Sequence, residues 1–133
     1  MLVNSAIGRW APWFSNVNDR SIGALAAQNY AAMAFCVVVL VPVVEEMLYR
    51  GLLFGSLYAK NKYLGYIASV AIFALVHVLG YVGDFSWTHL LLCFLQYLPA
   101  GAALAWAYVE SDTIWAPILM HMTINLLSIA AMR

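Results

Sequence analysis

Six polar side chains stand inside long apolar stretches of this sequence and are the first candidates for chemistry. Burying an ionisable side chain in apolar surroundings is costly unless the group is paired, so such residues are expected to pair or to mark a functional site. The six are two acids, a guanidinium, two imidazoles and an amide: Glu45, Glu46, Arg50, His77, His121 and Asn125.

The two adjacent glutamates differ in their local partners. Arg50 follows Glu46 by four residues, and this spacing, with the acid first, favours an ion pair on a helix. Glu45 is rotated about 100° from Glu46 on a helix and has no partner in its own segment. We therefore expect Glu46 and Arg50 to support the site and Glu45 to carry the chemistry.

Glu45 and His77 are the expected water-activating pair, because a carboxylate beside an imidazole can act as a general base on water. His121 and Asn125 are four residues apart and share a helix face, so both can donate hydrogen bonds to an oxyanion. No Ser or Cys is obviously placed as a nucleophile, which leaves water as the attacker. The sequence thus predicts a hydrolase with these four catalytic residues.

A metal site is the first alternative. Glu45, His77 and His121 form a His2Glu set, the ligand group of several catalytic zinc sites. However, the HExxH pattern is absent, and the asparagine that follows His121 by four residues is a poor zinc ligand. We therefore expect no metal or other cofactor, with zinc as the competing hypothesis.

The composition sets the environment of these residues. Of 133 residues, 65% are hydrophobic and only 9% are charged, and the net charge is zero. An ordinary soluble domain is roughly half apolar, so this chain reads as a polytopic membrane protein surrounded by lipid. The sequence has no basic run, so no nucleic-acid partner is expected.

Four apolar segments can carry the polar residues, at about 22–58, 64–79, 87–109 and 113–132. A spanning helix needs about 20 residues, so the first segment is too long, and we expect one tilted helix over 30–58, kinked at Pro42. The predicted fold is an all-α, polytopic transmembrane bundle. It has about four long helices, with a conical or cleft-like polar site between them.

The depth of the polar residues agrees between segments. Counted from the turn near residue 60, Glu45 and His77 both lie ~20 Å into the membrane. Counted from the turn near residue 112, His121 and Asn125 lie ~13 and ~20 Å from the same face. Three helices are therefore expected to bring the acid, the imidazoles and the amide together near the midplane.

The N-terminal region is expected to be an interfacial segment. Residues 1–20 contain Trp10, Pro12, Trp13 and Phe14, which suit an interfacial anchor better than a span. Residues 21–133 would then form a single transmembrane domain.

Three short motifs carry a resemblance to a known family, and they occur in the order EEMLYR (Glu45, Glu46, Arg50), FALVH (Phe73, His77) and HMTIN (His121, Asn125). They resemble the EExxxR, FxxxH and HxxxN motifs of the CAAX protease and bacteriocin-processing (CPBP, or Abi) family, over roughly residues 43–127. The resemblance implies an intramembrane glutamic endopeptidase. In it, Glu45 and His77 activate water, His121 and Asn125 stabilise the tetrahedral intermediate, and Glu46, Arg50 and Phe73 support the site.

The resemblance also implies partners and a location. The substrate would be a peptide or protein, lipidated or not, because eukaryotic relatives trim prenylated CAAX proteins and many bacterial relatives process peptide bacteriocins or give immunity to them. The chain would be a multi-pass protein of the bacterial cell membrane. Family members commonly carry further helices before EExxxR, so an oligomer would be one way to complete a substrate groove. A non-catalytic immunity or scaffolding protein is the alternative from another class.

Overall fold

The computed structural model describes residues 14–131, and these form a bundle of helices without a strand. Trp10, Pro12 and Trp13 of the predicted interfacial anchor lie outside the described residues. The α-helices are α2 (Val17–Ala26), α3 (Tyr30–Phe35), α4 (Val41–Glu46), α5 (Gly55–Tyr58), α6 (Lys62–Leu79), α7 (Trp87–Ser111) and α8 (Trp115–Ala130).

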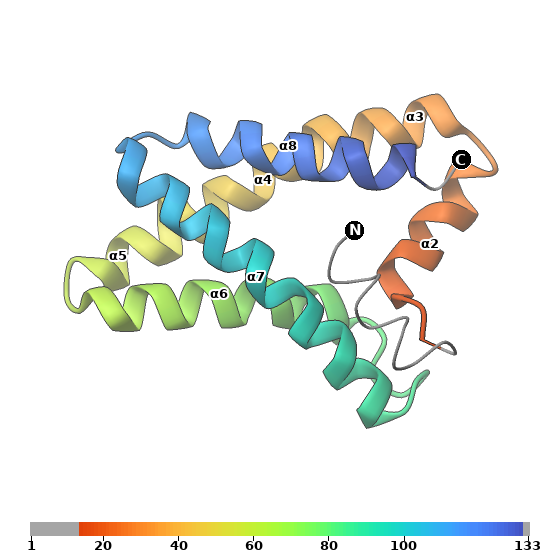
Figure 1. The fold of residues 1–133 in the computed structure, drawn as a ribbon, viewed down its shortest axis with the longest axis horizontal. Helices are drawn as coiled ribbons and strands as arrows, with labels where there is room; N and C mark the ends of the chain where they lie inside the picture. The colour runs from red at the N-terminus through yellow and green to blue at the C-terminus, as the bar shows by residue number, and fades with distance from the viewer. Residues whose placement is uncertain (1–13, 132–133) are drawn as a thin grey trace.

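The segments α3, α4 and α5 belong to one continuous helix, Tyr30–Tyr58, as the sequence predicts. Two π-helical segments, Cys36–Leu40 and Met47–Phe54, join them. The first ends two residues before Pro42, which has no N–H to give to a preceding turn. The predicted change of direction is visible in Figure 1, where α3 is nearly parallel to α8 while α4 and α5 slant away from α8 toward α6.

Helices α6 and α7 form the most extensive contact of the bundle. A Cβ atom at Gly101 would lie 3.1 Å from Cδ1 of Phe73, so a larger residue at that point would require the Phe73 ring to shift. By contrast, a Cβ atom at Gly51 would meet nothing within 4 Å. Gly101 therefore lies at a close contact between helices α6 and α7, whereas Gly51 does not lie at a close contact between helices.

The fourth predicted segment is shorter than expected. Helix α8 has 16 residues, or ~24 Å, against a hydrocarbon thickness of ~30 Å. Its start is delayed because Asp112 ends α7 in the left-handed conformation, with φ 51°. Among residues 14–131, three helices are long and apolar enough to cross a membrane, namely Tyr30–Tyr58, Lys62–Leu79 and Trp87–Ser111. The fold is an all-α membrane helical bundle with three long helices and one shorter one.

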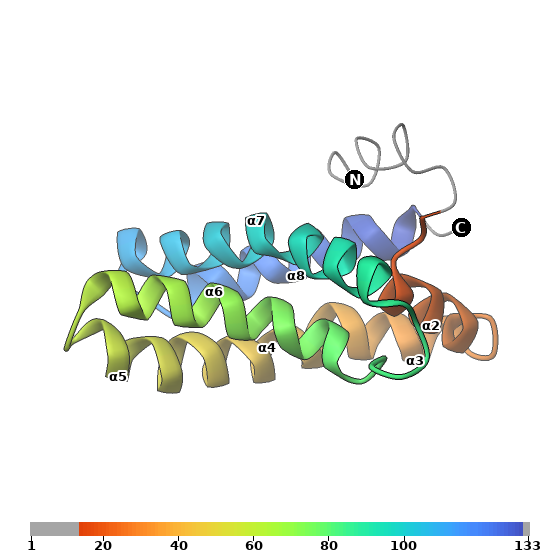
Figure 2. The ribbon, with the colours of Figure 1, turned by 90° about the horizontal axis from the view of Figure 1, so that it is seen from below.

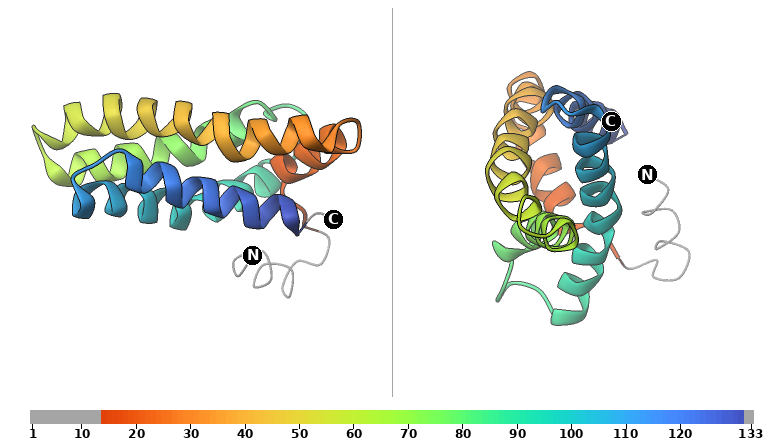
Figure 3. Two further views of the ribbon diagram at one scale, coloured as in Figure 1. Left: turned by 90° about the horizontal axis from the view of Figure 1, so that it is seen from above. Right: turned by 90° about the vertical axis from the view of Figure 1, so that its left-hand side faces the viewer.

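The bundle has two sides, with α7 and α8 on one and the continuous helix with α6 on the other (Figure 2). Helix α2 lies across one end, behind the longer helices in the end-on view of Figure 3. The Asn16 side chain caps α2 by accepting from the N–H groups of Asn18 and Asp19, and it bonds to Gln96 and Tyr97 of α7. The described part of the predicted interfacial segment is therefore packed against α7.

Candidate functional site

The polar cluster has a fully buried part, which we call the buried base: Glu46, Arg50 and His121. Arg50 Nη1 donates to Glu46 Oε1 at 3.0 Å, and both side chains are 0% exposed. Arg50 Nη2 donates to the Gly101 carbonyl of α7 at 3.1 Å, and its guanidinium lies 4.9 Å from the centre of the Phe73 ring. The predicted ion pair is thus confirmed, and it ties together three helices.

His121 joins the buried base from α8. Its Nδ1 lies 2.9 Å from Glu46 Oε1, and since a carboxylate can only accept, this nitrogen carries the hydrogen. The other ring nitrogen, Nε2, then faces Glu45 Oε2 at 3.9 Å. Glu46 therefore fixes both the tautomer and the orientation of His121, as carboxylate partners do for many functional histidines.

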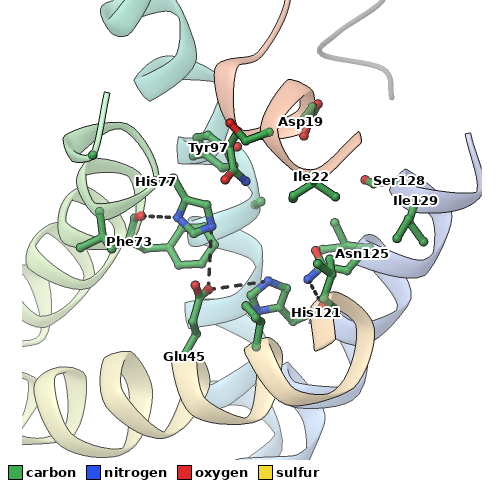
Figure 4. A pocket seen from close by; sticks show the side chains of 18 of the residues that line it. Asp19, Ile22, Glu45, Phe73, His77, Tyr97, His121, Asn125, Ser128 and Ile129 are labelled. Carbon is green, nitrogen blue, oxygen red and sulfur yellow. Dashed lines mark hydrogen bonds and ion pairs between the residues drawn. The ribbon is translucent and has the colours of Figure 1, made fainter. Parts of the chain in front are cut away.

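Glu45 and His77 form the open part of the cluster, which we call the cavity pair. His77 Nδ1 lies 2.8 Å from the Phe73 carbonyl, to which it donates. Its Nε2 is left with a lone pair and lies 3.9 Å from Glu45 Oε2, too far for a direct hydrogen bond. Glu45 Oε2 is buried without a hydrogen-bond partner among the described residues. Figure 4 shows both Glu45 contacts converging on this one oxygen.

Two aromatic rings hold the imidazole of His77. The Phe73 ring lies 4.6 Å from it, centre to centre, and the Tyr97 ring lies 4.3 Å from it. Tyr97 also donates to Asn16 Oδ1 at 3.0 Å. The sequence analysis named Phe73 but missed Tyr97, because the packing of Tyr97 against His77 depends on how α7 crosses α6.

Asn125 lies on the same wall as His121, but its amide contacts backbone rather than the cavity pair. Nδ2 donates to the carbonyl of Val37 at 2.8 Å. The second hydrogen on this nitrogen is not used by that bond. The structure thus brings His77 and His121 to 3.9 Å from one oxygen of Glu45, and it places Asn125 beside them with a contact that the sequence did not indicate.

A cavity of about 620 Å³ opens onto these residues, and its lining is mostly apolar. All four predicted catalytic residues line it. Helix α2 closes one end, and this contribution was also missed, since only the fold shows that α2 lies over the site. The lining residues from α2 are Asn18, Asp19, Ser21, Ile22 and Leu25.

A metal ion would place strict demands on the donor atoms of the cluster. A zinc ion requires ligand atoms about 2.0–2.2 Å away. Within residues 14–131, no group of three His, Cys, Asp or Glu side chains is arranged to hold a metal ion. The Nδ1 atoms of both site histidines are bound to other partners, so only their Nε2 atoms could serve as metal ligands.

The chain is similar to two curated proteins. It is 36% identical over 86 residues to the "Putative membrane peptidase YdiL" of Bacillus subtilis (strain 168), a stretch covering 63% of this chain and 30% of that protein. It is 30% identical over 95 residues to the "UPF0177 protein YxdF" of Lactococcus lactis subsp. lactis (strain IL1403), covering 71% and 47%. The matched stretches thus span less than half the length of both relatives. No solved structure matches the chain.

A family model described as type II CAAX prenyl endopeptidase, Rce1-like, matches residues 27–127. The matched range contains the buried base, the cavity pair and Asn125, and it extends over most of the chain. The chain therefore belongs to the Rce1-like family of type II CAAX prenyl endopeptidases.

Proposed function

We propose that this chain carries the active site of an intramembrane glutamic endopeptidase that hydrolyses a peptide bond with an activated water. The observation that carries the proposal is the 3.9 Å separation between Glu45 Oε2 and His77 Nε2 at the wall of the cavity. Both atoms are acceptors when Glu45 is ionised and His77 is neutral, so a water molecule can donate one hydrogen to each. At hydrogen bonds of about 2.8 Å, such a water subtends about 90°, which suits its two O–H bonds.

The reaction follows from this geometry. Glu45 takes a proton from the water as the new C–O bond forms, and the peptide carbonyl becomes an oxyanion. His121 Nε2, when protonated, and the second Nδ2 hydrogen of Asn125 are the donors toward that oxyanion. Each such donor contributes about 10²–10³-fold to the rate. The proton held by Glu45 then passes to the leaving amine as the C–N bond breaks.

The apolar lining of the cavity supports a peptide or protein substrate that enters from the membrane, with or without a lipid chain. We propose a multi-pass protein of the bacterial cell membrane, since both curated relatives come from bacteria. No metal or other cofactor takes part in this scheme, and lipid is the surrounding medium. Processing of a bacteriocin, or immunity to one, would be the biological setting.

The decisive test compares Glu45→Gln with the wild type in folded, membrane-inserted protein, using quenched fluorescent peptides with and without a prenylated cysteine. We expect Glu45→Gln to lower the cleavage rate by about 10²–10⁴-fold. Glu110→Gln is the matched control, because Glu110 is exposed at the end of α7. Full cleavage by Glu45→Gln would contradict the proposal. A wild type that cleaves none of the peptides would favour the immunity or scaffolding role, and loss of activity on chelation would favour zinc.

A further inference from the structure

We propose that Asn125 is a positioning residue that, together with Pro42, sets the rotation of the helix segment carrying Glu45. This role is separate from donation to an oxyanion. It is argued from hydrogen bonds and from the residues that line the cavity, and only its consequence for catalysis rests on the proposed function. The argument begins with the hydrogen bonds of the π-helical segment Cys36–Leu40.

The carbonyl of Val37 has two possible donors in its own helix. In a regular α-helix it would accept from the N–H of Val41, four residues on. Here the Val41 N–H instead donates to the Cys36 carbonyl, five residues back. The next bond of that five-residue pattern would come from residue 42, which is a proline and has no N–H. Asn125 Nδ2 supplies the missing donor from α8 at 2.8 Å.

The π-helical segment decides which residues face the cavity. Met33, Val37, Val41 and Glu45 all line it, at steps of four residues. In a plain α-helix each such step drifts by about 40°, so Glu45 would end about 120° from Met33. One extra residue, as a π-bulge provides, takes back about 100°. The four side chains therefore stay on one stripe, and Glu45 reaches the cavity.

Asn125 favours this arrangement because it supplies a donor to the Val37 carbonyl, which has none in its own helix while the Val41 N–H is bound to Cys36. While its amide is bound to Val37, the Val41 N–H is free to keep the π-helical bond to Cys36. Helix α8 thus holds the continuous helix at two points, through Asn125 to Val37 within the π-helical segment and through His121 to Glu46 after it. Without the amide, the Val41 N–H can return to Val37, and the segment carrying Glu45 rotates.

The test measures this rotation directly, without reference to catalysis. Pairs of spin labels are placed at exposed positions of the protein in lipid nanodiscs, after replacement of Cys36 and Cys93 by Ala. The reporting pair joins Val44 and Leu119, after the bulge, and the reference pair joins Phe35 and Leu126, before it; these four side chains are exposed. We expect Asn125→Leu to shift or broaden the first distance by about 3 Å or more, since a turn of about 100° moves a side chain by several ångström, and to leave the second unchanged.

Pro42→Ala provides a rescue that a direct role on the substrate would not show. The alanine restores an N–H that can donate to the Val37 carbonyl within the existing five-residue pattern. We therefore expect Pro42→Ala alone to keep the wild-type distances, and Pro42→Ala with Asn125→Leu to recover the reporting distance lost in Asn125→Leu. Thr123→Val is the matched control on α8, because Thr123 is exposed and bonds only to its own helix at Leu119.

Two results would overturn the proposal. One is an unchanged reporting distance in Asn125→Leu, and if cleavage were lost in that variant, Asn125 would act on the reaction alone and the proposed function would stand. The other is a double variant whose reporting distance is changed as much as in Asn125→Leu, or a double variant that fails to fold. If Asn125→Leu itself does not fold, recovery of the folded protein by Pro42→Ala supports the proposal and its absence counts against it.

Discussion

The buried base and the cavity pair each contain a glutamate and a histidine, but the two glutamates differ in their hydrogen-bond partners. In the buried base, Glu46 Oε1 accepts from both Arg50 and His121, and all three side chains are closed off. In the cavity pair, Glu45 Oε2 lies 3.9 Å from two imidazole nitrogens and bonds to neither. Two adjacent residues of one helix are thus an acid with two hydrogen-bonded partners and an acid that bonds to neither of its neighbouring imidazoles.

The largest expected effect comes from removing the cation of the buried base. Arg50→Met leaves Glu46 buried without its main partner, which should lower the free energy of unfolding by about 3–5 kcal/mol. The measurement is equilibrium unfolding in mixed micelles of increasing denaturing detergent. Lys62→Met is the control, since Lys62 is exposed at the start of α6. A loss below about 1 kcal/mol would show that the ion pair contributes little.

Removing both charges should cost less than removing one. In Arg50→Met with Glu46→Gln no unpaired charge is buried, and the glutamine that replaces Glu46 can still accept from His121 through its amide oxygen. We expect about 2 kcal/mol of the loss caused by Arg50→Met to be recovered in the same unfolding assay. If the losses of unfolding free energy caused by the two single substitutions simply added in the double variant, the buried base would not act as a unit.

Phe73 touches both parts, so its substitution tests whether they can be separated. Phe73→Leu removes the ring that faces the Arg50 guanidinium and the ring face beside His77. We expect the free energy of unfolding to fall by about 1–2 kcal/mol, together with slower peptide cleavage. Phe35→Leu, at an exposed position, controls for loss of a ring alone. An unchanged cleavage rate in Phe73→Leu would mean that His77 needs no aromatic support.

The smallest effect is expected on the far side of His77. Tyr97→Phe keeps the ring that packs against His77 and removes the hydroxyl that donates to Asn16. The lost hydrogen bond should cost about 1 kcal/mol of unfolding free energy and leave cleavage nearly unchanged. Asn16→Ala, measured alongside, removes the partner together with the α2 cap, so it should cost more. A large loss of cleavage in Tyr97→Phe would instead place the hydroxyl in the chemistry.

The sequence was sufficient to predict a contact where one helix contains both partners. It was also sufficient to predict which residues lie at the same depth in the membrane. The Glu46 to Arg50 pair follows from four-residue spacing, and the common depth of Glu45 and His77 follows from counting along two helices. The kinked helix Tyr30–Tyr58 was also predictable, because no turn residue interrupts it and Pro42 stands within it.

Other parts of the site could not be predicted, because they depend on contacts that produce no periodic pattern in the sequence. The bond from Asn125 to Val37 involves a backbone carbonyl, and a carbonyl without a donor is visible only once the π-helical pattern is known. The cover provided by α2 and the packing of Tyr97 depend on helix crossing. The short length of α8 reflects where the turn at Asp112 ends.

The ion pair of the buried base has a further consequence for how the chain enters the lipid. An isolated charge at the centre of a spanning helix costs about 2.5–3.5 kcal/mol on insertion. Glu46 and Arg50 lie on one helix, so they can neutralise each other before any other helix arrives to help. The helix that carries Glu45 and Glu46 therefore also carries Arg50, the counter-ion of Glu46. Only Glu45 depends on the later arrival of other helices to bury its charge.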